Sequence, residues 1–326
     1  MEQVVIGIDL GGTTTTLGAV TRSGEVRGRQ TFDTRAAGGF PAYVAQLKEE
    51  IERVCDRAGA GLAGIGVGAP AGNHRYGTVQ AANLDWGGTV RFTDALARHF
   101  DVPISLDNDA NATALGEMRY GAARPYRHFI LVTLGTGLGS GIVNNGQVIY
   151  GGDGLAGEMG HICVDVNGRD CACGRKGCLE TYVSANGLKR TAFELMAHRV
   201  TPSVLRDYGY HALSAQRISE AAAAGDPLAR EAFEYTGKLL GLKLADAVAH
   251  TSPEAIILFG GLANAGPALF EPTARALKQY MLFLYNPDIP LLPSALPQSD
   301  AAVLGAAALA WQQVEKRNGG GPEGEN

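Results

Sequence analysis

The sequence predicts an α/β chain made of two similar domains with a cleft between them. Short apolar runs without helical spacing, at residues 4–8 and 129–134, are typical of buried strands, and they alternate with longer amphipathic segments. A strand, a glycine-rich turn and a second strand follow one another at residues 8–20 and again at residues 131–143. This repetition indicates a duplicated domain, each copy of which has a sheet and helices packed around its own core.

The first half begins with a strand-rich segment. Its β-branched and apolar runs, separated by short turns, predict an antiparallel meander of three strands followed by two buried strands, at residues 4–8, 13–20, 25–32, 65–68 and 104–106. Apolar side chains at helical spacing after Pro41 predict a helix over residues 41–58. A second helix is expected over residues 110–118.

The second half repeats this alternation. Strands are expected at residues 129–134, 140–143 and 255–259, and helices at residues 184–198, 227–250 and 301–314. The predicted domains are residues 1–118, completed by a C-terminal helix at 300–315, and residues 119–299. The glycine-rich tail, residues 316–326, cannot bury apolar surface and is expected to be disordered.

Composition argues against several classes of partner. The chain has 326 residues, 28 basic and 33 acidic side chains and a net charge of -5, without a basic run. Nucleic acid and anionic membranes are therefore not expected as partners. The N-terminus lacks the pattern of a signal peptide, and no apolar run is long enough to span a bilayer. We expect a cytoplasmic protein.

A cluster of cysteines predicts a zinc site. Cys171, Cys173 and Cys178 follow closely on His161, and three thiolates with one imidazole can surround a tetrahedral ion. The alternative is a chance cluster of thiols in a reducing compartment. Cys163 is expected to be a buried thiol rather than a further ligand.

Three glycine-rich strand ends predict a phosphate-binding site. Asp9 is followed by Gly11, Gly12 and Thr13, an arrangement that brings backbone amides close to phosphate oxygens while the carboxylate holds a hydrated Mg²⁺. The segments Gly135-Thr136-Gly137 and Gly260-Gly261 resemble it. Tight turns without a ligand are the alternative. The P-loop motif is absent, and the dinucleotide-like pattern at residues 64–68 is broken by the three residues that follow.

The segment whose side chains are most suited to catalysis is residues 106–111, at a predicted strand-to-helix junction. Phosphoryl transfer to an alcohol needs a carboxylate that accepts the hydroxyl proton, and Asp109 is our candidate. Asn108 could hydrogen-bond a neighbouring hydroxyl. The alternative is that both side chains cap the following helix, a position in which Asp and Asn are favoured.

Together these motifs resemble, in order, those of the ROK (repressor–ORF–kinase) family of sugar kinases, and its bacterial glucokinases are the most similar. The motifs are Asp9-Leu10-Gly11-Gly12-Thr13, Asn108-Asp109-Ala110-Asn111, Leu134-Gly135-Thr136-Gly137, Gly157-Glu158-Met159-Gly160-His161 and the three-cysteine block, and the resemblance covers residues 4–312. It implies the two-domain actin-like or hexokinase-like (ribonuclease H-like) fold, closing on sugar and ATP, and a homodimer or higher homo-oligomer. The implied reaction is ATP-dependent phosphorylation of a hexose, glucose first, at its 6-hydroxyl.

The resemblance also implies residue roles. Asp109 would be the general base on the 6-hydroxyl. The sugar would contact Gly68, Asn83, Asn108, Glu158, His161 and Glu180. ATP and Mg²⁺ would bind at Asp9, Gly11, Gly12, Thr13, Thr14, Gly135, Thr136, Gly137, Gly260 and Gly261. Two positions depart from the family pattern: Thr14 replaces a common Lys or Asn, and Ala71 follows Pro70 where Gly is commoner.

Other activities within the family remain alternatives. An N-acetylmannosamine or N-acetylglucosamine kinase would use the same glutamate and histidine contacts, and a fructose or allose kinase is a further choice. A sugar-responsive repressor is disfavoured because the first strand starts by Val4, which leaves no room for a preceding DNA-binding domain.

The zinc is expected to be structural, because His161 and three cysteines fill all four positions. It would close the loop between Glu158 and Glu180 and direct the second imidazole nitrogen toward the sugar. No partner is recognisable in the sequence for the other histidines: His74, His99, His128, His198, His211 and His250.

Overall fold

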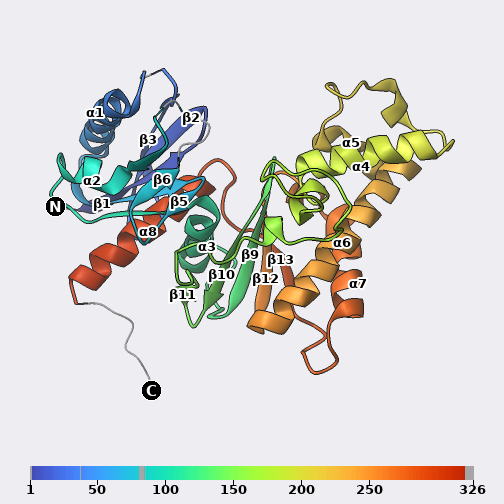
Figure 1. The fold of residues 1–326 in the computed structure, drawn as a ribbon. Helices are drawn as coiled ribbons and strands as arrows, with labels where there is room; N and C mark the ends of the chain where they lie inside the picture. The colour runs from blue at the N-terminus through green and yellow to red at the C-terminus, as the bar shows by residue number, and fades with distance from the viewer. Residues whose placement is uncertain (1, 37, 81–83, 85, 320–326) are drawn as a thin grey trace. The chain divides into compact units, whose positions relative to one another are not determined.

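The computed structural model describes residues 2–36, 38–80, 84 and 86–319, and it divides into two compact units (Figure 1). Unit 1 comprises Met1–Pro125, Val148–Ala156 and Ala295–Asn326, and unit 2 comprises Tyr126–Gln147 and Gly157–Ser294. The predicted boundary lay seven residues earlier, at 118 rather than 125, and did not include the short middle segment of unit 1.

Unit 1 is built on a five-stranded sheet in the order β3-β2-β1-β4-β8. Its strands are β1 (Gln3–Leu10), β2 (Thr14–Val20), β3 (Val26–Asp33), β4 (Gly61–Ala69) and β8 (Ile104–Asn108). The first three form the predicted antiparallel meander, whereas β4 and β8 run parallel to β1. All five strands were predicted, with shorter bounds.

The two faces of this sheet bury different kinds of residue. Alternate side chains of β1, including Ile6 and Ile8, join a hydrophobic core with helix α1 (Phe40–Ala58). On the other face, Gly7 and Gly66 lie against the last helix, α8 (Ala301–Arg317), where an added Cβ would overlap backbone carbonyl oxygens of α8. The C-terminal helix is therefore an integral layer of unit 1, beside α3 (Asp109–Tyr120).

Between β4 and β8 lies a part of unit 1 that sequence patterns did not predict. A small three-stranded sheet and one short helix occupy it: β5 (Gly72–Asn73), β6 (Thr78–Gln80), β7 (Thr89–Arg91) and α2 (Phe92–Ala97). Their strands have only two or three residues, too few to show a period.

Unit 2 repeats the sheet of unit 1, in the order β11-β10-β9-β12-β13. Its strands are β9 (Phe129–Leu134), β10 (Leu138–Asn144), β11 (Gln147–Val148), β12 (Ala255–Phe259) and β13 (Leu291–Pro293). The central strand β9 pairs antiparallel with β10 and parallel with β12, as β1 does with β2 and β4. The predicted duplication is confirmed, and with it the two-domain actin-like or hexokinase-like fold.

A large helical core covers one face of the second sheet. Ile130, Val132 and Leu134 of β9 point into it and meet apolar side chains of the surrounding helices. The helices are α4 (Ala185–His198), α5 (Ala215–Ala223), α6 (Pro227–Thr251) and α7 (Pro267–Tyr280), with short 3₁₀ turns η1 (Met159–His161), η2 (Leu179–Thr181), η3 (Val204–Asp207) and η4 (Ala263–Ala265). Sequence patterns predicted α4 and α6 but not α5 or α7.

The C-terminal tail begins later than predicted. Helix α8 continues to Arg317, so the first two residues of the predicted tail are helical, and residues 320–326 lie outside the described residues. Among the residues that the structure describes, no helix combines the length and apolar character needed to cross a bilayer.

Candidate active site

The corner between β8 and α3 holds the candidate base. Asn108 is the N-cap of α3, and its Oδ1 accepts a hydrogen bond from Ala110 N at 2.9 Å. Asp109 Oδ1 accepts from the same amide at 2.8 Å, while its side chain remains open to solvent. Capping is therefore real, and it holds both polar groups at the surface of the corner, where a hydroxyl could reach them.

Two carboxylates of unit 1 influence each other electrostatically. Burial, reinforced by the charge of Asp109, raises the pKa of Asp9 to about 6, whereas Arg29 opposes this shift. The side chain of Asp109 is exposed, yet the protein atoms around it still desolvate the carboxylate and raise its pKa. A cation near these two groups would relieve the repulsion between them.

The first glycine turn joins β1 to β2. Gly11 N donates to Thr14 O at 3.0 Å, which closes the turn, and an added Cβ on Gly12 would meet no atom within 4 Å. Thr13 and Thr14 are exposed at its tip. The open space above Gly12 leaves room for the close approach of a phosphate.

Unit 2 contains a pocket of about 590 Å³ at the equivalent turn of its own sheet. Its lining includes Gly135, Thr136 and Gly261, which the structure therefore brings together. The rest of the lining was not predicted: Ala185, Ser214, Ala215, Gln216, Ser219, Glu220, Leu262, Asn264 and Ala265. Ser214 caps α5 through Arg217 N at 3.2 Å, so a helix-start pattern was the only signal in the sequence.

Two of the predicted glycines have other roles. Gly137 faces Glu180, and Gly260 has a φ of 105° and lies so close to Leu134 that a Cβ would be 2.6 Å from its carbonyl oxygen. Neither is among the described residues that line the pocket.

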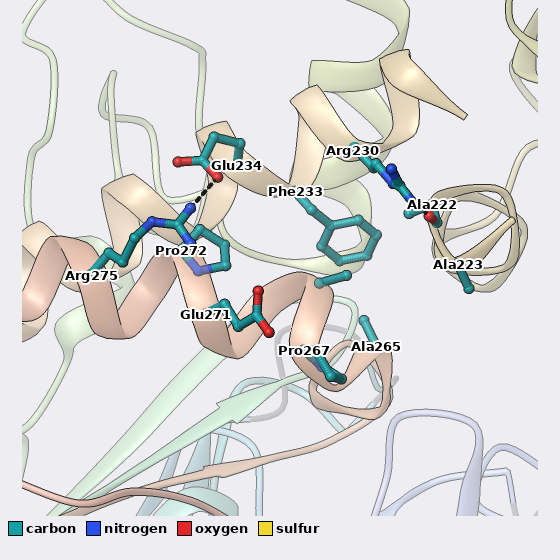
Figure 2. Close-up of a pocket in the computed structure, with 11 residues that line it drawn as sticks. Ala222, Ala223, Arg230, Phe233, Glu234, Ala265, Pro267, Glu271, Pro272 and Arg275 are labelled. Atoms are coloured by element: carbon teal, nitrogen blue, oxygen red, sulfur yellow. Dashed lines mark hydrogen bonds and ion pairs between the residues drawn. The ribbon is translucent and has the colours of Figure 1, made fainter. Parts of the chain in front are cut away.

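A second pocket, of about 430 Å³, lies beside this one between α5, α6 and α7 (Figure 2). Phe233 lines its floor, Arg230 Nε donates to Ala222 O at 3.1 Å, and Glu234 forms an ion pair with Arg275. It contains none of the predicted site residues.

The candidate sugar contacts of unit 2 lie on two neighbouring 3₁₀ turns. Glu158 is the N-cap of η1, His161 is its last residue, and Glu180 lies in η2. Leu179 N donates to Ile162 O at 2.9 Å and so links the two turns. Glu180 Oε2 accepts a hydrogen bond from Leu138 N at 2.9 Å. The carboxylate of Glu180 thus ties the sugar-binding candidates to the β9–β10 turn.

The four predicted zinc ligands converge. The ligand atoms of His161, Cys171, Cys173 and Cys178 all lie within 4.8 Å of one another. Cys171 Sγ is 3.8 Å from His161 Nδ1, and Cys173 Sγ is 3.6 Å from Cys178 Sγ. A hydrogen bond from the backbone of Arg175, followed by its side chain, lowers the pKa of Cys173 to about 6 and favours the thiolate that binds metal.

Arg169 anchors the cysteine loop to the turn that carries Glu180. Its guanidinium donates to Thr181 O at 2.7 Å, pairs with Glu194 and lies 4.4 Å from the centroid of the Tyr182 ring. Cys163 lies outside the cluster and is exposed, so the expectation of a buried thiol was wrong. It sits on an isolated β-bridge opposite Cys178 at the surface.

The remaining predicted positions lie in unit 1. Gly68 is buried in β4, where a Cβ added to it would lie 3.4 Å from the Cβ of Ala112. Ala71 adopts a φ of 51°, in the left-handed region that glycine enters more readily than alanine. Asn83 lies outside the described residues.

Comparison with known proteins identifies the family. The family model described as "ROK family" matches residues 5–313. A glucokinase of Halalkalibacterium halodurans is 34% identical over 324 residues, which cover 96% of this chain and 97% of that protein. The chain belongs to the ROK family.

Solved structures of ROK proteins are also similar to it. The glucokinase of Streptomyces griseus in complex with glucose and AMPPNP has a TM-score of 0.77 and 31% identity, covering 95% of this chain and 99% of that one. A ROK transcriptional regulator, a homologue of the Escherichia coli MLC protein, has a TM-score of 0.84 and 27% identity, covering 95% of this chain and 78% of that one.

Proposed function

We propose that this ROK protein transfers the γ-phosphoryl group of ATP to the 6-hydroxyl of a hexose and that glucose is its preferred substrate. The observation that carries the proposal is the unit 2 pocket, because Gly135, Thr136 and Gly261 line one cavity of a size suited to a nucleotide. The identity to a glucokinase over almost the full length of both chains supports the choice of sugar.

Asp109 is the proposed base. Its carboxylate would accept the proton of the 6-hydroxyl as that oxygen attacks the γ-phosphorus and the bond to the β-phosphate oxygen breaks. The raised pKa of Asp109 suits this role, because a stronger base takes the proton more readily. Asn108, fixed as the cap of α3, would orient a neighbouring hydroxyl.

Backbone amides and a metal would balance the phosphate charge. The glycine turns after β1 and β9 would donate amides to phosphate oxygens, and Asp9 would hold Mg²⁺, which neutralises charge on the transferred group. The fit rests on the buried, electrostatically strained carboxylate of Asp9, since a divalent cation offsets that strain.

Glu158, His161 and Glu180 are the proposed sugar contacts of unit 2. Carboxylates and imidazole hydrogen-bond ring hydroxyls, and the two 3₁₀ turns hold all three residues on one small piece of backbone. We propose that the enzyme acts in the cytoplasm, which fits its five free cysteines, and that it forms a homo-oligomer.

We also propose a structural Zn²⁺ bound by His161, Cys171, Cys173 and Cys178. Tetrahedral zinc with sulfur at about 2.3 Å places two sulfur ligands about 3.8 Å apart, and the 3.6 Å between Cys173 Sγ and Cys178 Sγ is close to this value. A sulfur and an imidazole nitrogen on the same ion would be about 3.6 Å apart, close to the 3.8 Å between Cys171 Sγ and His161 Nδ1. The ion would stiffen the loop between the sugar contacts without taking part in the reaction.

Metal content tests the zinc. We expect one zinc per chain, and Cys178→Ser should lose it, lower the melting temperature and weaken glucose binding. Cys163→Ser is the matched control, because this exposed thiol lies outside the cluster. Full zinc content in the Cys178→Ser variant would contradict the assignment.

A panel of sugars tests the substrate. With ATP and Mg²⁺, glucose should give the highest kcat/KM for ADP release, above N-acetylmannosamine, N-acetylglucosamine and fructose. A kcat/KM for glucose well below that for N-acetylmannosamine would move the protein to the amino-sugar kinases.

A sugar-responsive regulator is the second candidate function, favoured by the similarity to the ROK transcriptional regulator. Binding of genomic DNA fragments, with and without sugar, distinguishes the two candidates. The kinase account predicts no sequence-specific binding.

A further inference from the structure

Asp107 is a buried carboxylate two residues before the proposed base, and the reaction described above does not use it. Its side chain is 1% exposed. One oxygen, Oδ1, accepts hydrogen bonds from Asn108 N at 2.7 Å and Asn111 Nδ2 at 3.0 Å. The other oxygen, Oδ2, accepts from the hydroxyl of Tyr150 at 2.7 Å. Asp107 therefore bonds to residues on both sides of Asp109.

Tyr150 is itself held by a histidine for which the sequence showed no partner. The rings of His74 and Tyr150 stack, with centroids 4.4 Å apart and planes within 7°. His74 Nδ1 lies 3.2 Å from Leu106 O and 3.8 Å from Asp107 Oδ2. The stack fixes the tyrosine ring so that its hydroxyl meets the carboxylate.

Tyr150 comes from the middle segment of unit 1, Val148–Ala156, whose neighbours on both sides belong to unit 2. Further contacts hold this segment to the loop that carries His74: Asn73 Nδ2 donates to Asp153 O at 2.9 Å, and Arg75 donates to Gly152 O. Glu158, a proposed sugar contact, follows two residues after the segment ends.

The charge of Asp107 depends on this contact. Burial raises the pKa of Asp107, and the hydrogen bond from Tyr150, then that from Asn111, oppose the rise. Tyr150 and His74 are the titratable groups that act on Asp107, while α3 contributes the uncharged Asn111. Asp109 acts on Asp9 instead. Tyr150 thus favours the ionised form, which can accept all three hydrogen bonds.

We propose that Tyr150 and His74, acting through Asp107, are positioning residues that set the orientation of the β8–α3 corner and of the Asp109 base. This inference rests on the proposed kinase function. None of the three residues needs to contact substrate: the tyrosine and histidine hold Asp107, and Asp107 holds the backbone of Asn108 and the first turn of α3.

Tyr150→Phe tests the proposal while keeping the ring stack. We expect kcat to fall about 10-fold, with KM for sugar and ATP within about twofold of wild type, because the base is misoriented rather than substrate lost. The acidic limb of the kcat–pH profile should move to higher pH, since Asp107 loses a donor that lowers its pKa. Tyr76→Phe is the matched control: Tyr76 is 57% exposed and lies on the same loop as His74.

Two variants of His74 separate the effect of the ring stack from that of the other imidazole contacts. His74→Phe preserves the stack but loses the Nδ1 contacts with Leu106 and Asp107, so it should lower kcat less than His74→Ala, which loses the stack as well and should lower kcat as Tyr150→Phe does. A Tyr150→Phe enzyme with wild-type kcat and an unchanged acidic limb of the kcat–pH profile would overturn the proposal. A Tyr150→Phe enzyme that only melts at a lower temperature, with neither kinetic change, would overturn it as well. A wild-type chain that phosphorylates no hexose would instead overturn the proposed function, and the positioning role with it.

Discussion

At the residue scale, the ionised carboxylate of Asp9 lowers the stability of the folded protein. Its pKa rises from 3.8 to about 6 in the folded protein. The folded state therefore holds a proton that the unfolded chain has already released, and the associated stability is lost as pH rises through about 6. Above that pH the ionised Asp9 destabilises the fold, at a place where a Mg²⁺ ion would offset the charge.

Asp9→Asn should accordingly be more stable than wild type at pH 8, by about 1–2 kcal/mol once solvent screening is allowed for. The difference should largely vanish at about pH 3, which lies below the pKa of Asp9 in both the unfolded and the folded state, so that the wild-type carboxyl is mainly protonated in both. Urea unfolding at the two pH values measures this, and the same variant should have lost kinase turnover. Equal stability at pH 8 would show that Asp9 is not destabilised by its surroundings.

The carboxylate of Glu180 links two proposed ligand-binding regions, the sugar contacts and the turn after β9. A Cβ on Gly137 would overlap Glu180 Oε2, the atom that accepts from Leu138 N. Gly137→Ala should therefore displace the carboxylate and weaken glucose binding about 10-fold in the absence of nucleotide, as measured by calorimetry.

Gly135→Ala is the comparison for this variant. It alters the same turn, but its Cβ would meet no atom within 4 Å. Glucose affinity without nucleotide should match that of wild type. If both variants bind glucose equally, the contact between Gly137 and Glu180 does not orient the sugar site.

Sequence spacing was sufficient to find residues that act within one short segment. The proposed zinc ligands and the pair Asn108 and Asp109 are local patterns. Asp107, His74 and Tyr150 could not be found in this way, because they lie on three segments up to 76 residues apart (150 − 74 = 76) and meet only in the folded unit.

At the scale of elements, unit 1 depends on the close approach of α8 to its central strands. Gly66 of β4 faces the backbone of α8, and a Cβ there would overlap the Ala306 carbonyl oxygen. Helix and strand must separate to accommodate even a methyl group, because backbone atoms cannot move aside as a side chain can.

Gly66→Ala should therefore cost about 3 kcal/mol or more in the free energy of unfolding. Gly28→Ala, on β3, is the control, since its Cβ would lie 3.5 Å from Val54, an ordinary contact distance. Thermal unfolding of the two variants decides the matter. A Gly66→Ala melting temperature equal to that of Gly28→Ala would contradict this packing.

The elements that sequence patterns missed share a physical reason. β5, β6 and β7 are too short to show a period, and α7 contains Pro272 in its interior, which ordinarily ends a helix. The predicted β1, β9 and α6 are longer apolar segments, each with glycine or proline at one end.

At the scale of the whole molecule, the two units carry equivalent glycine-rich strand ends, for which we propose different roles. The end of β1 carries Asp9, the proposed metal ligand, whereas the turn after β9 opens on the proposed nucleotide pocket. The repeat was visible in the sequence because both turns are rich in glycine. The return of residues 148–156 to unit 1 was not, since no composition change marks it.

Asp109 is the proposed base of an ATP-dependent hexose kinase, and its removal should largely stop the reaction. Phosphorus NMR of a mixture of glucose, ATP and Mg²⁺ measures product directly, for wild type and for Asp109→Ala. We expect glucose 6-phosphate and ADP from wild type, and a rate about 10²–10⁴-fold lower from the variant, which should still bind ATP. An Asp109→Ala enzyme that forms glucose 6-phosphate at close to the wild-type rate would contradict this assignment.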